Sequence, residues 1–191
     1  MRGRAIWSGR GGLGLLGILL LGALAVGAFS VGHNAAAVAA PPSAGVALGK
    51  SGLPVPRFVS LKAGRVNVRV GPGEDYKVSW VFTKPALPVE VIQEFDTWRR
   101  IRDSDGSVGW VFHSLLSGKR TAVVAPWTKG EPRPIHAEAS AASAVTAYLQ
   151  PGVMAAIDRC SGGWCRLSGG NFSGWIKQDQ LWGVYPDEEI D

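Results

Sequence analysis

The chain has 191 residues, including 26 glycines, 12 prolines and 8 tryptophans, and its formal net charge is +5. This length suits one domain or two small ones, and the abundant glycine and proline favour short strands joined by tight turns. Arg2, Arg4 and Arg10 account for three of the 20 basic residues, which leaves 17 against 15 acidic ones. So small an excess excludes the charge footprint of a nucleic-acid-binding domain.

Residues 1–39 have the order of a secretory signal peptide: a basic start, an uncharged apolar run over residues 13–29 and a small Ala-Val-Ala site at residues 37–39. We expect cleavage after Ala39 and a periplasmic location for the remainder of the chain. An uncleaved membrane anchor is the alternative, because the apolar run is close to the lower limit of about 17–25 residues for a spanning helix.

Residues 40–56 are rich in Pro, Ala, Ser and Gly without periodicity, which predicts a flexible linker. From residue 57 the pattern becomes β, and an Asp-Ser-Asp-Gly hairpin signal stands at residues 103–106. Short strands at this spacing indicate a small barrel over residues 57–120. The expected strands are residues 58–62, 66–70, 78–82, 89–92, 98–102 and 108–112.

The most specific string is residues 65–73, Arg-Val-Asn-Val-Arg-Val-Gly-Pro-Gly. Its valines alternate with polar residues, as in a half-buried strand, and Gly-Pro-Gly ends that strand in a turn. The string resembles the opening strand and first long loop of bacterial SH3 (SH3b) domains, with Tyr76 at the place of the loop aromatic. Val70 departs from the small residue usual there. Trp98, Gly109-Trp110-Val111 and Leu115-Leu116 match later features of that family.

An internal repeat extends the resemblance. A shift of 66 positions places Trp98 on Trp164, and a shift of 65 places Gly109-Trp110 on Gly174-Trp175. We therefore predict an all-β chain of two tandem SH3-like barrels after the signal peptide, the second over residues 121–186 and followed by an acidic tail at 187–191. The alanine-rich residues 135–149 have helical propensity, but the repeat spacing leaves no room for a helix, so we expect loop and strand.

The only cysteines, Cys160 and Cys165, flank a predicted hairpin turn, where cross-strand Cβ atoms come within disulfide distance. A metal pair would lack further ligands, and a catalytic thiol would need a base, for which His136 is the one histidine in this half. We expect a structural disulfide. The flanking Trp-Cys-Arg and the Leu-Trp-Gly-Val-Tyr-Pro at residues 181–186 resemble an exported SH3 subgroup of α-proteobacteria, the DUF1058 type.

Catalytic motifs, metal-ligand sets and cofactor fingerprints are missing from the sequence, so we expect no enzyme, no metal and no cofactor. A binding module remains, because aromatic rings stack on sugars and arginines pair with carboxylates. We expect Trp110 and Trp175 in the core. For Trp98 and Trp164, burial in the core and contact with a ligand are equally expected. Asn67 and Arg69 are expected to fix a turn. The candidate ligand-binding residues are Glu74, Asp75, Tyr76, Trp98 and Arg100 in the first unit, and Trp164, Arg166 and Phe172 in the second.

The resemblance implies a non-catalytic exported protein that binds peptidoglycan or another cell-envelope polymer. The alternative is a periplasmic adaptor that docks an extended segment of a partner such as a cell-wall enzyme. An enzyme of unrecognised type is a third, weaker hypothesis. We expect no nucleic-acid partner, and membrane contact only through an unprocessed N-terminal segment.

Overall fold

The computed structural model describes residues 47–191, and these contain strands, turns and two 3₁₀ turns but no α-helix. The predicted signal peptide, its cleavage site and the first part of the predicted linker lie outside the described residues. Within residues 47–191 no helix has the length and apolar character needed to cross a membrane.

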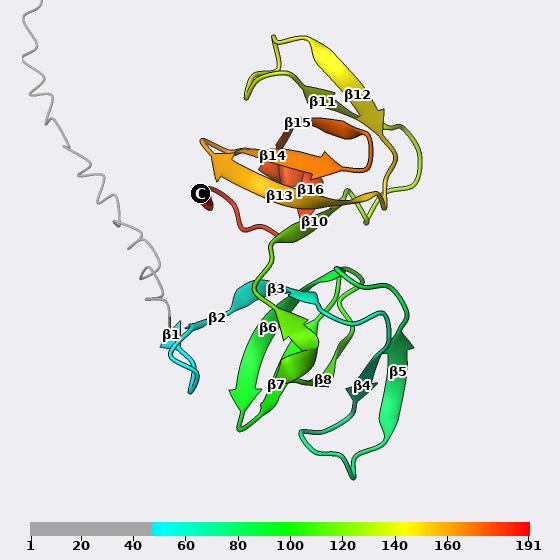
Figure 1. The fold of residues 1–191 in the computed structure, drawn as a ribbon, viewed down its shortest axis with the longest axis vertical. Helices are drawn as coiled ribbons and strands as arrows, with labels where there is room; N and C mark the ends of the chain where they lie inside the picture. Colours follow the sequence, from blue (N-terminus) through cyan, green and yellow to red (C-terminus); the bar gives the residue numbers. More distant parts are fainter. Residues whose placement is uncertain (1–46) are drawn as a thin grey trace, which may run out of the picture. The chain divides into compact units, whose positions relative to one another are not determined.

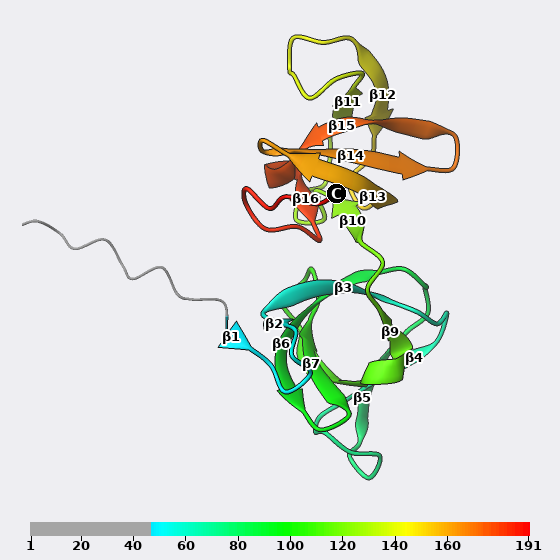
Figure 2. The ribbon, with the colours of Figure 1, turned by 60° about the vertical axis from the view of Figure 1, so that its left-hand side comes forward.

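Residues 57–117 form the first barrel, which is seen as a ring of strands in Figure 2. Seven antiparallel strands follow the order β5-β4-β8-β7-β6-β3-β9. The elements are β3 (Arg57–Leu61), β4 (Val66–Arg69), β5 (Val78–Phe82), β6 (Pro88–Phe95), β7 (Trp98–Arg102), β8 (Val108–Phe112), η1 (His113–Leu115) and β9 (Leu116–Ser117).

Residues 121–182 form the second barrel, whose order β12-β11-β15-β14-β13-β10-β16 repeats that of the first strand for strand (Figure 1). The prediction of two tandem all-β units is therefore confirmed. The elements are β10 (Thr121–Val124), β11 (Arg133–His136), β12 (Val145–Leu149), β13 (Met154–Ser161), β14 (Trp164–Gly169), β15 (Phe172–Lys177), η2 (Gln178–Gln180) and β16 (Leu181–Trp182).

Each barrel has its own apolar core. In the first, Val66 and Val68 are fully buried while Asn67 between them is exposed, which confirms the half-buried strand predicted there. In the second, the disulfide between Cys160 and Cys165 joins register partners on β13 and β14 and lies inside the core. The alanine-rich segment forms β11, a loop and β12. The disulfide and the non-helical reading of this segment are both confirmed.

Part of the segment expected as a linker is structured instead. Residues 47–55 form a two-stranded hairpin of β1 (Ala47–Leu48) and β2 (Pro54–Val55). Glu94 anchors it by accepting hydrogen bonds from the Ser51 backbone N–H at 2.8 Å and the Ser51 hydroxyl at 2.7 Å. Arg57 and Arg99 pair with the same carboxylate, whose side chain is only 2% exposed. The hairpin is held by polar contacts, so hydropathy does not reveal it.

This anchor predicts a loss of stability in acid. Burial acts to raise the pKa of Glu94, but the hydrogen bonds from Ser51 and Arg57 and the charge of Arg99 lower it from 4.5 to about 2. The folded pKa lies below the unfolded one, so the stability that this carboxylate contributes is fully present above about pH 4.5 and is lost as the pH falls towards 2. Urea unfolding should show Glu94→Gln less stable than the parent at neutral pH, with the gap closing in acid. A gap independent of pH would contradict this.

The predicted acidic tail is also part of the fold. Glu188 accepts hydrogen bonds from Arg120 at 2.6 Å and from the Tyr185 N–H at 2.9 Å. Ile190 exchanges two backbone hydrogen bonds with Cys160 on β13. The last residues thus extend the sheet of the second barrel by one antiparallel β-bridge, between Ile190 and Cys160.

Residues of the two barrels also contact each other. The Phe58 ring lies 5.1 Å from the Trp182 ring and 4.8 Å from the Tyr185 ring, measured between centroids. The Tyr185 hydroxyl donates to Glu90 at 2.9 Å, and the Trp182 indole N–H donates to the Pro88 carbonyl at 3.1 Å. Glu90 is buried at 3% exposure, so its polar partners are part of the packing between the barrels.

Candidate ligand-binding faces

One outer face of each barrel repeats the same arrangement of tryptophan and arginine. On β7 and β8, Arg100 lies directly opposite Trp110, and on β14 and β15, Arg166 lies opposite Trp175. Register partners share a face of the sheet. Their strand neighbours Ile101 and Val111 point inward and are fully buried. Both Arg–Trp pairs therefore stand on the outside of their barrels.

The structure corrects the expectation that Trp110 and Trp175 are core residues. Both are half-buried and neither belongs to a core cluster. Trp98, which we expected to be balanced between core and ligand, is 8% exposed although it stands on the outer face. The Phe112 ring covers it edge-on at 5.5 Å. Trp98 has no free ring face for stacking and instead supports the surface beside Trp110.

An exposed phenylalanine that the sequence did not single out completes the aromatic surface of the first barrel. Phe95 is 52% exposed, and its ring meets Trp110 edge-on at 6.5 Å. It ends β6 beside the hairpin turn, where an apolar residue looks like part of the strand pattern. Only the pairing of β6 with β7 and of β7 with β8 brings it to Trp110.

The long loop after β4 brings Tyr76 towards the same face. Arg69, the register partner of Trp110, donates to the Tyr76 carbonyl at 2.6 Å. A side chain at Gly71 would collide with the Tyr76 ring, so that ring packs on the glycine, yet it remains 49% exposed. Arg69 thus fixes the loop, as expected, while Glu74 and Asp75 are exposed beside Tyr76. We call Tyr76, Phe95, Arg100 and Trp110 the barrel-1 face.

In the second barrel, a histidine takes the place of Arg69 and contacts the corresponding loop. His136, the register partner of Trp175, places its Nδ1 3.1 Å from the Ser143 carbonyl in the equivalent loop. Its ring also meets Trp164 edge-on at 5.6 Å. A role in holding the loop accounts for His136 without catalysis.

The second outer face is more cationic than the first. Lys177 lies opposite Trp164, with its Nζ 6.0 Å from the ring centroid, and Arg159 lies opposite Arg166. Among the described residues none of these three cations forms an ion pair. We call Arg159, Trp164, Arg166, Trp175 and Lys177 the barrel-2 face. Unpaired cations beside half-buried indoles suit a ligand with flat apolar surfaces and carboxylates.

Phe172 does not belong to this face. It pairs with Gly169 at the far end of the β14–β15 hairpin, whereas Trp164 pairs with Lys177 at the near end. Five residues along a strand correspond to about 17 Å. Phe172 packs against the second core, so its predicted role in ligand binding is replaced by a structural one.

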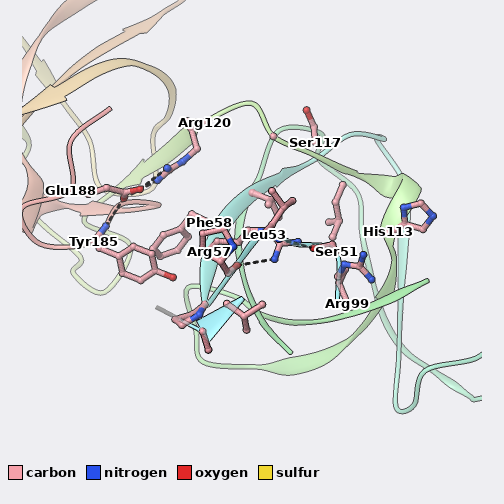
Figure 3. Close-up of a pocket in the computed structure, with 17 residues that line it drawn as sticks. Ser51, Leu53, Arg57, Phe58, Arg99, His113, Ser117, Arg120, Tyr185 and Glu188 are labelled. Carbon is pink, nitrogen blue, oxygen red and sulfur yellow. Dashed lines mark hydrogen bonds and ion pairs between the residues drawn. The ribbon is translucent and has the colours of Figure 1, made fainter. Parts of the chain in front are cut away.

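A cavity lies away from both faces. It has a volume of about 1010 Å³ and is bordered by the β1–β2 hairpin, β3, β9 and the segment around Tyr185 (Figure 3). Burial, together with the hydrogen bond to Glu90, raises the pKa of Tyr185 above its usual range. Burial acts to raise the pKa of Glu188 as well, but the hydrogen bonds from Arg120 and the Tyr185 N–H lower it. Sequence patterns do not reveal this cavity, because its walls come from segments that are far apart in the chain.

The described residues contain no cluster of three or more His, Cys, Asp or Glu side chains able to hold a metal ion. The acidic groups with shifted pKa values are occupied in ion pairs and hydrogen bonds with the hairpin and the C-terminal segment.

The sequence profile described as "Bacterial SH3 domain" matches residues 62–118 and again residues 129–183. No curated protein matches the chain. Two similar solved structures are NlpC2 from Trichomonas vaginalis, with 14% identity and a TM-score of 0.32, and NlpC1 from the same organism, with 13% and 0.31. The matches cover 66% of this chain and 48% and 45% of the two others. This chain thus spans about half the length of those structures.

Proposed function

Because this chain belongs to the bacterial SH3 domain family, we propose that it is a non-catalytic exported protein that binds a cell-envelope polymer, with peptidoglycan as the first candidate. Binding takes place through the barrel-1 and barrel-2 faces. The observation that carries this proposal is the repeated outward Arg–Trp pair, Arg100 with Trp110 and Arg166 with Trp175.

The chemistry of peptidoglycan fits these faces. Its sugars present flat C–H surfaces that stack on indole rings, and its peptide stems carry carboxylates that pair with guanidinium and ammonium groups. A single exposed ion pair contributes little to the binding free energy. We therefore assign most of the affinity to the half-buried Trp110 and Trp175. Arg166 and Lys177 provide the selection for acidic stems. The core disulfide supports an oxidising compartment such as the periplasm.

The test is retention of the purified protein on isolated sacculi. We expect the double variant Trp110→Ala, Trp175→Ala to lose at least about tenfold in retention, which corresponds to about 1.4 kcal/mol. Trp127→Ala is the matched control, because Trp127 is also exposed, at 54%, but stands in the β10–β11 loop and is not one of the residues of either face.

A second pair of variants tests the charges. Arg166→Gln with Lys177→Gln should weaken retention mainly at low salt, because salt screens exposed charges. Flow-through of the unmodified protein would refute the proposal and favour an adaptor role. Equal retention of the double tryptophan variant and the Trp127 control would refute the assignment of the faces.

A further inference from the structure

The cavity beside β3 combines an apolar wall with an unused strand edge (Figure 3). Leu53, Pro54 and Val55 of the hairpin line it together with Phe58, Val59 and Leu116. Its volume of about 1010 Å³ is at the upper end of the range of about 300–1,000 Å³ found for ligand pockets.

The strand edge follows from the alternation of hydrogen bonds along β3. Leu61 bonds towards the β6 side, through Leu87 and Ala86, whereas Lys62 bonds to Leu115 on the β9 side. Even-numbered residues of β3 therefore direct their backbone groups towards β9. The β3–β9 ladder covers only Ser60 and Leu61.

Phe58, the next even-numbered residue, lies beyond the end of this ladder and lines the cavity. It makes no backbone hydrogen bond outside the sheet ladders of the described chain. Its N–H and C=O therefore border the cavity as one donor and one acceptor, the pair that an added antiparallel strand uses.

The charged side chains around the cavity favour an acidic occupant. Arg57 and Arg99 share the single carboxylate of Glu94, and Arg120 pairs with Glu188. Three guanidinium groups thus face two carboxylates, with an excess of one positive charge. In Figure 3, Arg120 and Glu188 stand at one end of the cavity, and Ser51 and Arg99 at the other.

We infer that this cavity, lined by the hairpin, β3 and β9, is a second binding site that takes an extended apolar peptide segment carrying a carboxylate. The segment pairs with the backbone of Phe58, places apolar side chains against Leu53 and Val59, and directs its carboxylate towards the shared Arg57–Glu94–Arg99 cluster. This site is independent of the two outer faces and takes a different class of ligand from the polymer proposed for them.

A substitution at Gly118 can place a large side chain at the cavity without changing the core of the barrel. It lines the cavity, and a Cβ added to it would meet no atom within 4 Å. Gly118→Phe should therefore add a large side chain at the cavity wall without disturbing the barrel, and Gly118→Ala is the matched control that adds only a methyl group. Unchanged melting temperature and sacculus retention of both variants separate this test from that of the outer faces.

The probe is a phage-displayed library of short random linear peptides, selected on the full chain. We expect enrichment of peptides with adjacent apolar residues and an Asp or Glu, which bind the unmodified protein and Gly118→Ala but bind Gly118→Phe at least about tenfold more weakly. N-methylation of a central backbone amide and replacement of the acid by its amide should each weaken binding. No enrichment, equal binding to Gly118→Phe, or indifference to N-methylation would overturn the inference.

Discussion

Replacing Gly109 by alanine is expected to lower the free energy of unfolding by about 3 kcal/mol, because overpacking at a close strand crossing costs about 1–3 kcal/mol. A Cβ at this position would collide with the Val68 side chain and lie 3.0 Å from the Trp80 ring and 3.1 Å from the Arg69 carbonyl oxygen. The carbonyl belongs to the backbone of β4 and cannot rotate away. Urea unfolding followed by tryptophan fluorescence measures the loss.

Alanine substitutions at two other glycines provide comparisons for the stability loss expected at Gly109. Gly174, the equivalent in the second barrel, would bring a Cβ within 2.9 Å of the His136 carbonyl oxygen and of the Thr146 hydroxyl. Since the hydroxyl can move and the carbonyl cannot, we expect a loss of about 2 kcal/mol for Gly174→Ala. Gly118→Ala, in open space, should change stability by less than about 0.5 kcal/mol. A Gly109→Ala variant as stable as Gly118→Ala would contradict the close crossing.

Removal of Arg102 is expected to cost about 3 kcal/mol, because it leaves a buried carboxylate without its cation. Arg102 donates from Nε to Glu90 at 2.8 Å, and the Glu90 side chain is only 4% exposed. In Arg102→Ala the Tyr185 hydroxyl remains as a donor to this carboxylate, but one neutral hydrogen bond does not replace the ion pair. Equilibrium unfolding in urea measures the difference.

The neighbouring Arg100 is a matched control for this prediction. It lies two residues earlier on the same face of β7 but is exposed, and its contact with Gln93 is long, at 3.5 Å. Arg100→Ala should therefore change stability by less than about 0.5 kcal/mol. In the Arg102→Ala background, a second change of Glu90→Gln should restore part of the loss, since it removes the buried charge. Equal stability of the two arginine variants would contradict a structural role for the Glu90 pair.

The sequence pattern did not predict which tryptophans on the outer faces are buried. Trp98 and Trp110 both stand in strands with the same alternation, and the pattern alone favoured Trp110 as the core residue. In the barrel, the Phe112 ring from the next strand covers Trp98, whereas the aromatic neighbour of Trp110 is the exposed Phe95. Which indole is covered depends on cross-strand neighbours, and these are set by the register between β6, β7 and β8.

The sequence by itself determined the features that depend on local periodicity and on spacing. These are the six strands predicted in the first barrel, the repetition of that barrel, the non-helical alanine-rich segment and the disulfide at a hairpin turn, because alternation and turn residues act over a few positions along the chain. Only the tertiary structure decided the ordered hairpin on Glu94, the docked acidic tail and the cavity beside Phe58. Each of these is built by polar groups or strand edges from distant segments, and such pairings leave no periodic trace in the chain.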